Sequence, residues 1–272
     1  MIETAHLFRP LGAALLELLR SLPADAWAVR TSAGEWSVQD VVAHMLDGDL
    51  RRLSAQRDGH VPAPASPPTS HAELVGFLNE LNRTWVEAAR RLSPRLLVEL
   101  LEVSTARIAD MMESTDPAAA ATFAVGWAGE ASSLMWLDMA REYTERWHHQ
   151  DQIREATFAP PLAEPRWLRP VLTASLLALP HALREVDAPA GTSVVLRIDG
   201  TSGGTWSLTR QGTWVLQEGA PVSPAATITA SDLTMCRLLL HRLTPAQVAS
   251  QVRADGEASL IAPLLAARAV MV

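Results

Sequence analysis

The sequence contains no lysine, and all 23 of its basic residues are arginines. This absence excludes a Schiff-base mechanism and the phosphate-binding lysine of P-loop proteins. Thirty acidic residues bring the formal net charge to −7, and scattered arginines lack the basic stripe that nucleic-acid binding requires. The single cysteine, Cys236, excludes an internal disulfide and a multi-thiolate metal site. Any tight metal site must therefore use histidines and carboxylates.

Long apolar runs are also missing. A membrane-spanning helix needs about 20 apolar residues, whereas the most apolar stretches, such as residues 172–183, are short and interrupted by proline. Residues 1–11 include Glu3 and lack the basic start and apolar core of a secretory signal. We therefore expect a cytoplasmic protein with neither membrane nor nucleic acid among its partners.

Glycine use divides the chain in two. Residues 1–190 hold seven glycines, whereas six more fall between residues 191 and 219. In the first part, apolar residues recur at spacings of three and four and predict helices at 11–22, 38–53, 74–92, 96–112 and 134–153, four of them long enough for a bundle. Ser37 and Asp40 form a capping-box-like start for the second helix. Residues 58–71 include four prolines and predict a loop, either a functional lid or merely a mobile segment.

The second part has the pattern of a small mixed domain. Segments rich in Val, Ile, Thr and Trp predict strands at 193–198, 205–209, 213–217 and 226–229, and glycine turns join the first three into an antiparallel meander. Helices are predicted at 232–241, 245–252 and 258–267, with Ser231 and Thr244 as caps on the first two. The fold class is α+β and multidomain, with a helical domain at 1–157, a helical connector at 158–190 and a smaller α+β domain at 191–272.

The helix predicted at 134–153 has an apolar side and an unusual polar side. The apolar side comprises Trp136, Met139, Ala140, Tyr143 and Trp147, and the polar side comprises Asp138, Glu142, Glu145, His149 and Gln152. Glu145 and His149 are four residues apart and reach one point, which makes them candidate metal ligands. Glu142 competes with Glu145 but lies seven residues from His149, and His148 projects at nearly a right angle to His149.

His44, in the helix predicted at 38–53, is the candidate third ligand. It lies outside the apolar stripe of that helix, on the side of Asp40, Asp47 and Arg51. If the two polar sides meet across a cleft, two imidazoles and one carboxylate leave a position open for water or substrate, as in catalytic zinc sites. The alternative is that both polar sides face solvent, as on any surface helix. The other histidines have no partner at ligand spacing and are interpreted as surface or core residues: His6, His60, His71, His181 and His241.

These residues resemble a known family. Residues 35–44, EWSVQDVVAH, resemble the Trp-[Ser/Thr]-Val-x-Asp-Val-x-x-His signature of the thiol-dependent maleylpyruvate isomerase N-terminal domain, a DinB-like four-helix metalloprotein. Residues 141–154 resemble the later metal-binding helix of the same family, with its Glu-x-x-x-His pair. The resemblance implies that His44, Glu145 and His149 are the metal ligands and that they face a cleft. Beyond residue 191, the order of strands and helices resembles the sterol-carrier-like domain that often follows in this family.

The resemblance also implies a reaction. The expected function is a metal-dependent enzyme that uses a low-molecular-weight thiol such as mycothiol for cis–trans isomerisation of, or thiol transfer to, a small unsaturated acid. A divalent ion, zinc or alternatively nickel, would hold the thiol as a thiolate, which adds to the double bond and leaves after rotation. An arginine of the second domain is expected to bind the substrate carboxylate. The sequence offers Arg210, Arg237 and Arg242 without choosing among them.

Two other functions stay open at this stage. The first is a non-enzymatic protein that binds an apolar ligand in its sterol-carrier-like domain and carries a structural metal, because the apolar residues 260–272 fit a cavity-lining helix as well as an ordinary core. The second is a hydrolase that uses metal-bound water, although no second acid–base carboxylate stands out. A monomer and a homodimer are both compatible with the sequence.

Overall fold

The structure is a computed structural model that describes residues 1–61 and 70–270. Its contacts group the chain into two compact units. The helical unit comprises Glu3–Thr122 and Glu145–Pro161, and the mixed unit comprises Met1–Ile2, Phe123–Thr144 and the chain from Leu162 to the end of the described residues. The domain boundaries at 157/158 and 190/191 stay predictions.

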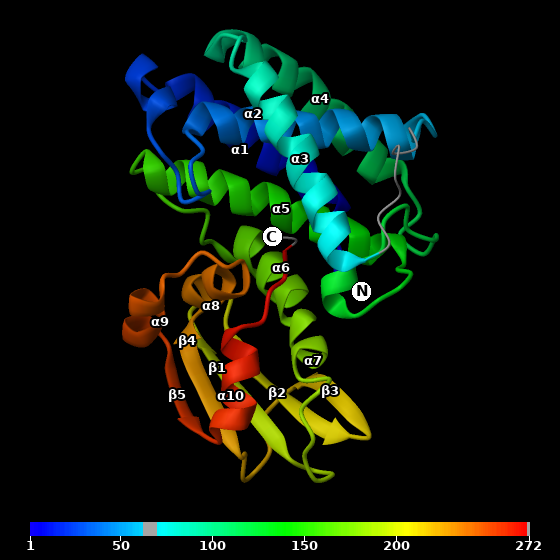
Figure 1. The fold of residues 1–272 in the computed structure, drawn as a ribbon, viewed down its shortest axis with the longest axis vertical. Coiled ribbons are helices and arrows are strands. Elements are labelled where there is room, and N and C mark those ends of the chain that lie inside the picture. Colours follow the sequence, from blue (N-terminus) through cyan, green and yellow to red (C-terminus); the bar gives the residue numbers. More distant parts are fainter. Residues whose placement is uncertain (62–69, 271–272) are drawn as a thin grey trace. The chain divides into compact units, whose positions relative to one another are not determined.

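The helical unit contains the predicted amphipathic helices. Its elements are η1 (Ala5–Leu7), α1 (Phe8–Ser21), η2 (Ala24–Ala28), α2 (Val38–Arg52), the π-helical turn η3 (Leu53–Arg57), α3 (His71–Ala89), α4 (Pro94–Ser114) and the second part of α5 (Met135–Ala156). Helices α1 and α2 pack against α4, and α3 packs against α2 (Figure 1). Their buried apolar side chains form one core, to which α5 adds Ile153. Most of the loop predicted at 58–71 lies outside the described residues, and α3 begins at its last position.

The start of α2 is fixed by the predicted capping box. Ser37 Oγ accepts a hydrogen bond from the Asp40 amide at 3.3 Å, and the Asp40 carboxylate accepts one from the Ser37 amide at 3.1 Å. Arg90, which follows α3, donates to the same carboxylate at 2.9 Å. Two otherwise unsatisfied amides at the helix end are thus paired. This anchor fixes the start of the helix that carries His44.

The mixed unit is built on a five-stranded sheet, which confirms the α+β class. Its elements are the first part of α5, η4 (Gly126–Ala128), α6 (Pro165–Leu176), α7 (Ala178–Ala182), β1 (Ser193–Asp199), β2 (Gly204–Gln211), β3 (Thr213–Glu218), β4 (Ala226–Ser231), α8 (Asp232–Leu239), α9 (Pro245–Gln251), β5 (Arg253–Gly256) and α10 (Ala258–Leu265). The strand order is β3-β2-β1-β4-β5, and Figure 1 shows α10 lying against the sheet.

The sheet combines the predicted antiparallel meander with two further strands, β4 and β5. β1, β2 and β3 pair antiparallel, as the glycine turns predict. β4 pairs parallel to β1, and β5 pairs antiparallel to β4. Ser231 and Thr244 cap α8 and α9 as predicted. Within the described residues, none of the helices combines the length and apolarity that crossing a bilayer takes.

Candidate metal centre

Helices α2 and α5 bring His44 and His149 into contact inside the helical unit. The centroids of the two imidazole rings lie 4.8 Å apart, and the ring planes are nearly perpendicular, at 82°. Trp36, in the segment before α2, packs against the imidazole of His44, and the two ring centroids lie 5.0 Å apart. The two polar sides identified in the sequence therefore meet at these histidines.

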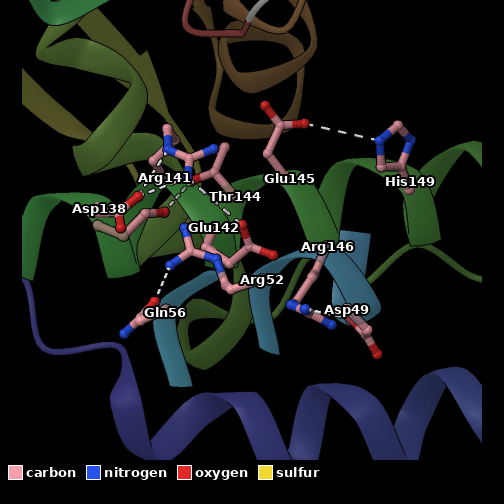
Figure 2. A network of polar contacts seen from close by, with 11 residues as sticks. Asp49, Arg52, Gln56, Asp138, Arg141, Glu142, Thr144, Glu145, Arg146 and His149 are labelled. Carbon is pink, nitrogen blue, oxygen red and sulfur yellow. Dashed lines mark hydrogen bonds and ion pairs between the residues drawn. The ribbon is translucent and has the colours of Figure 1, made fainter. Parts of the chain in front are cut away.

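Glu145 reaches the same point from one turn earlier on α5. Its Oε2 lies 3.8 Å from Nε2 of His149, and Figure 2 shows the carboxylate directed toward the imidazole. Zinc binds imidazole nitrogen at about 2.0–2.1 Å and carboxylate oxygen at about 2.0–2.2 Å. The separation of 3.8 Å is shorter than the sum of two such bonds. One divalent ion therefore fits between these two atoms.

The polar side of α5 is buried along most of its length, so the alternative of a solvent-facing surface helix is wrong. Asp138 is fully buried, and Gln152 is 4% exposed. The side chains of Glu145 and His149 are 26% and 14% exposed. Burying polar groups costs free energy unless they are paired. The burial therefore points to specific partners rather than to solvation.

The two competitors considered in the sequence have other contacts. The Glu142 carboxylate lies 3.7 Å from the Arg141 guanidinium. His148 is 7% exposed, and its Nε2 lies 3.1 Å from the amide nitrogen of Gln152. The amide oxygen of Gln152 lies 2.9 Å from Nδ1 of His149. One glutamine side chain therefore binds both adjacent histidines, through different ring nitrogens.

The complete ligand set stays a prediction. Across residues 1–61 and 70–270, no three or more His, Cys, Asp or Glu side chains are already arranged together as a metal site. The described geometry brings Glu145 to His149 and packs His44 edge-on against the same imidazole. The donor types are those of a catalytic zinc site, two imidazoles and one carboxylate. The residues present therefore fit a divalent ion.

A buried ion pair next to these residues was not identified from the sequence. Asp49 of α2 is fully buried and accepts a hydrogen bond from Arg146 of α5 (Figure 2). It accepts another from Ser104 of α4, at 2.6 Å. Thr105 also donates to this carboxylate, at 3.3 Å. The signal was present, because Asp49 falls four residues after Met45 and so interrupts the apolar stripe of α2. These contacts link α5 to α2 and α4 through Arg146, the residue that follows Glu145.

Comparison with known proteins identifies the family. The family model described as the mycothiol maleylpyruvate isomerase N-terminal domain matches residues 8–154, more than half of the chain. The chain belongs to this family. The match spans both polar sides and all three candidate ligands. A search of curated proteins found no match.

Solved structures extend the family likeness to the fold of the whole chain. The crystal structure of the mycothiol-dependent maleylpyruvate isomerase aligns with 93% of this chain and 92% of that protein, at a TM-score of 0.56 and 14% identity. A histidine-to-alanine mutant of that isomerase aligns equally well. Sterol Carrier Protein 2 Like 2 from Aedes aegypti aligns over 36% of this chain and 97% of its own, at 21% identity and a TM-score of 0.30. The alignment over 93% of the chain carries the fold assignment.

Proposed function

We propose that this chain is a metal-dependent enzyme that uses a low-molecular-weight thiol for cis–trans isomerisation of, or thiol transfer to, a small unsaturated acid. Membership of the mycothiol maleylpyruvate isomerase N-terminal domain family supports the thiol-dependent type. The observation that carries the proposal is the approach of Glu145 Oε2 to within 3.8 Å of His149 Nε2, on an imidazole that also packs against the ring of His44. A divalent cation is the ligand that such a pair favours.

His44, Glu145 and His149 are the residues that would hold the ion, zinc or alternatively nickel. A bound ion would lower the pKa of the external thiol, so that the nucleophilic thiolate would be available near neutral pH. The carboxylate of Glu145 offsets part of the cationic charge, and the two neutral imidazoles leave a position for an external donor. Trp36 packs against His44 and limits the access of water to that ring.

The sulfur must come from outside the chain. Cys236 is the only cysteine, and it is fully buried in α8. A buried apolar thiol is a poor nucleophile because burial disfavours the thiolate. An external thiol would therefore supply the nucleophile for the double bond of the acid and would be released again after isomerisation. An arginine of the mixed unit would bind the acid's carboxylate through two hydrogen bonds, and the candidates stay Arg210, Arg237 and Arg242.

Metal loading tests the ligand set. Protein purified without added metal is analysed for metal content and then titrated with zinc. We expect His149→Ala to abolish binding, because it removes the imidazole that faces Glu145. His148→Ala is the matched control, one position earlier on α5, and should load zinc like the wild type. The reverse result would move the ligand by one position, and absence of zinc from the wild-type chain would refute the site.

Turnover tests the reaction. A panel of low-molecular-weight thiols is assayed with maleylpyruvate, and isomerisation is expected only when a thiol is present. His44→Ala should remove this activity together with metal loading. Co-purification of a lipid, with no thiol-dependent turnover by the zinc-loaded protein, would instead favour the apolar-ligand binder.

A further inference from the structure

Helix α5 carries two adjacent histidines, and something must determine which of them binds the ion. His148 is 7% exposed, and the His149 side chain is 14% exposed, so burial does not separate them. Gln152 follows them by four and three residues, the spacings at which helical side chains meet. Its carboxamide contacts both rings, and at 4% exposure it is shielded from competing water.

The chemistry of the carboxamide assigns the protons of both rings. An amide oxygen only accepts a hydrogen bond, and an amide NH₂ group only donates. Since Gln152 Oε1 lies 2.9 Å from Nδ1 of His149, that nitrogen carries a proton, and in the neutral ring Nε2 then carries the lone pair. Since Gln152 Nε2 lies 3.1 Å from Nε2 of His148, this second nitrogen is the acceptor. The lone pair of His149 thus faces Glu145, whereas the Nε2 lone pair of His148 is occupied by Gln152.

We infer that Gln152 is a positioning residue that selects His149 over His148 as the ligand by fixing the tautomers of both rings. The inference rests on the proposed function, because it concerns the same ion. A ligating histidine needs an unprotonated nitrogen toward the metal and commonly donates its other N–H to a neighbouring acceptor. Gln152 provides that acceptor to His149, and its NH₂ group donates to the lone pair on Nε2 of His148.

Zinc affinity measures this selection directly. Affinities are determined by competition with a chelator for the full chain and for three variants. Gln152→Leu keeps an apolar side chain of similar size but removes the acceptor, and it should weaken zinc binding by about 10–100-fold, the usual effect of losing such a partner. Gln152→Glu retains an oxygen that accepts from Nδ1 of His149 and should preserve the affinity. His148→Leu leaves the bond between Gln152 and His149 intact and should bind zinc like the wild type.

Histidine tautomers give a second measurement that needs no metal. In the metal-free protein, long-range ¹H–¹⁵N spectra should show His149 protonated on Nδ1 and His148 protonated on its own Nδ1. Gln152→Leu should lose both preferences while the far-UV circular dichroism stays unchanged. This readout separates a positioning role from a general loss of folding.

The outcomes separate the selection by Gln152 from the proposed function. If the wild-type chain binds zinc and Gln152→Leu binds it equally well, the inference is overturned and the proposed function stands. A wild-type His149 protonated on Nε2 also overturns the inference. If the wild-type chain binds no zinc, the proposed function fails, and the selection inferred for Gln152 falls with it.

Discussion

Removal of the Asp49 carboxylate is expected to destabilise the helical unit strongly. Asp49 is fully buried and pairs with Arg146, whose side chain is 11% exposed, and Ser104 and Thr105 donate to the same carboxylate. Asp49→Ala leaves the guanidinium buried without this counter-charge. Removal of one partner of a buried ion pair costs about 3–5 kcal/mol. At about 3 °C per kcal/mol for a unit of this size, the melting temperature should fall by about 9–15 °C.

A double variant tests whether the charge pair, rather than the lost side-chain volume, causes this effect. Asp49→Leu combined with Arg146→Met removes both charges and should recover most of the stability, because apolar side chains commonly replace a buried ion pair without loss. Thermal melts followed by circular dichroism, together with urea unfolding, provide the measurement. A drop of less than about 2 °C for Asp49→Ala, or a double variant no more stable than the single one, would refute the reasoning. Zinc affinity of the double variant then shows whether this network also aligns Glu145.

Two further perturbations act on the helices that surround the site. Burial alone would raise the pKa of the Asp40 carboxyl, but hydrogen bonds from Arg90 and Ser37 outweigh it and hold the pKa below its ordinary value of 3.8. Asp40→Asn should therefore cost about 1–2 kcal/mol at neutral pH, and in melts at a series of pH values the difference from wild type should close below 3.8, as the carboxyl protonates. A constant difference would contradict this. A Cβ at Gly12 of α1 would lie 2.2 Å from Cγ2 of Thr105, so Gly12→Ala should lower the stability in urea by about 1–3 kcal/mol. Adding Thr105→Ser, which deletes that methyl group and keeps the hydroxyl, should restore most of the loss, whereas no rescue would mean that the close packing of α1 on α4 is not the cause.

The helices were predictable because their apolar period directly reflects which side is buried. The start of α2 was predictable because the Ser37–Asp40 capping box is local in sequence. The strand β5 was not predicted, since its four residues, Arg253–Gly256, have no apolar alternation. It forms because the edge of β4 offers backbone groups for pairing. Its last residue must be a glycine, because Gly256 has a φ of 110° and a Cβ there would lie 2.2 Å from the Ala225 carbonyl oxygen. Such pairing depends on tertiary structure.

The candidate site shows the same division between local and tertiary information. Spacing on one helix predicted that Glu145 and His149 reach one point, and their atoms lie 3.8 Å apart. The contact between His44 and His149 depends on how α2 packs against α5, which spacing alone left open. The role inferred for Gln152 was not predicted either, because it depends on the carboxamide oxygen lying against His149 and the carboxamide nitrogen lying against His148. A sequence gives the residue type at such a position but not the orientation of its donor and acceptor.

Burial of the polar side of α5 has a cost that bears on its function. An apolar helix would stabilise the core more, because each buried polar group needs a hydrogen-bond partner to offset its desolvation. Arg146 and Gln152 have such partners in Asp49 and in the two histidines. Glu145 and His149 lie one turn apart on this polar side, and Oε2 of the first is 3.8 Å from Nε2 of the second. A divalent cation bound between these two atoms, as proposed above, would be held by both. In the proposed site, the contacts of Arg146 with Asp49 and of Gln152 with the two histidines would therefore hold α5 in the position that the ion requires.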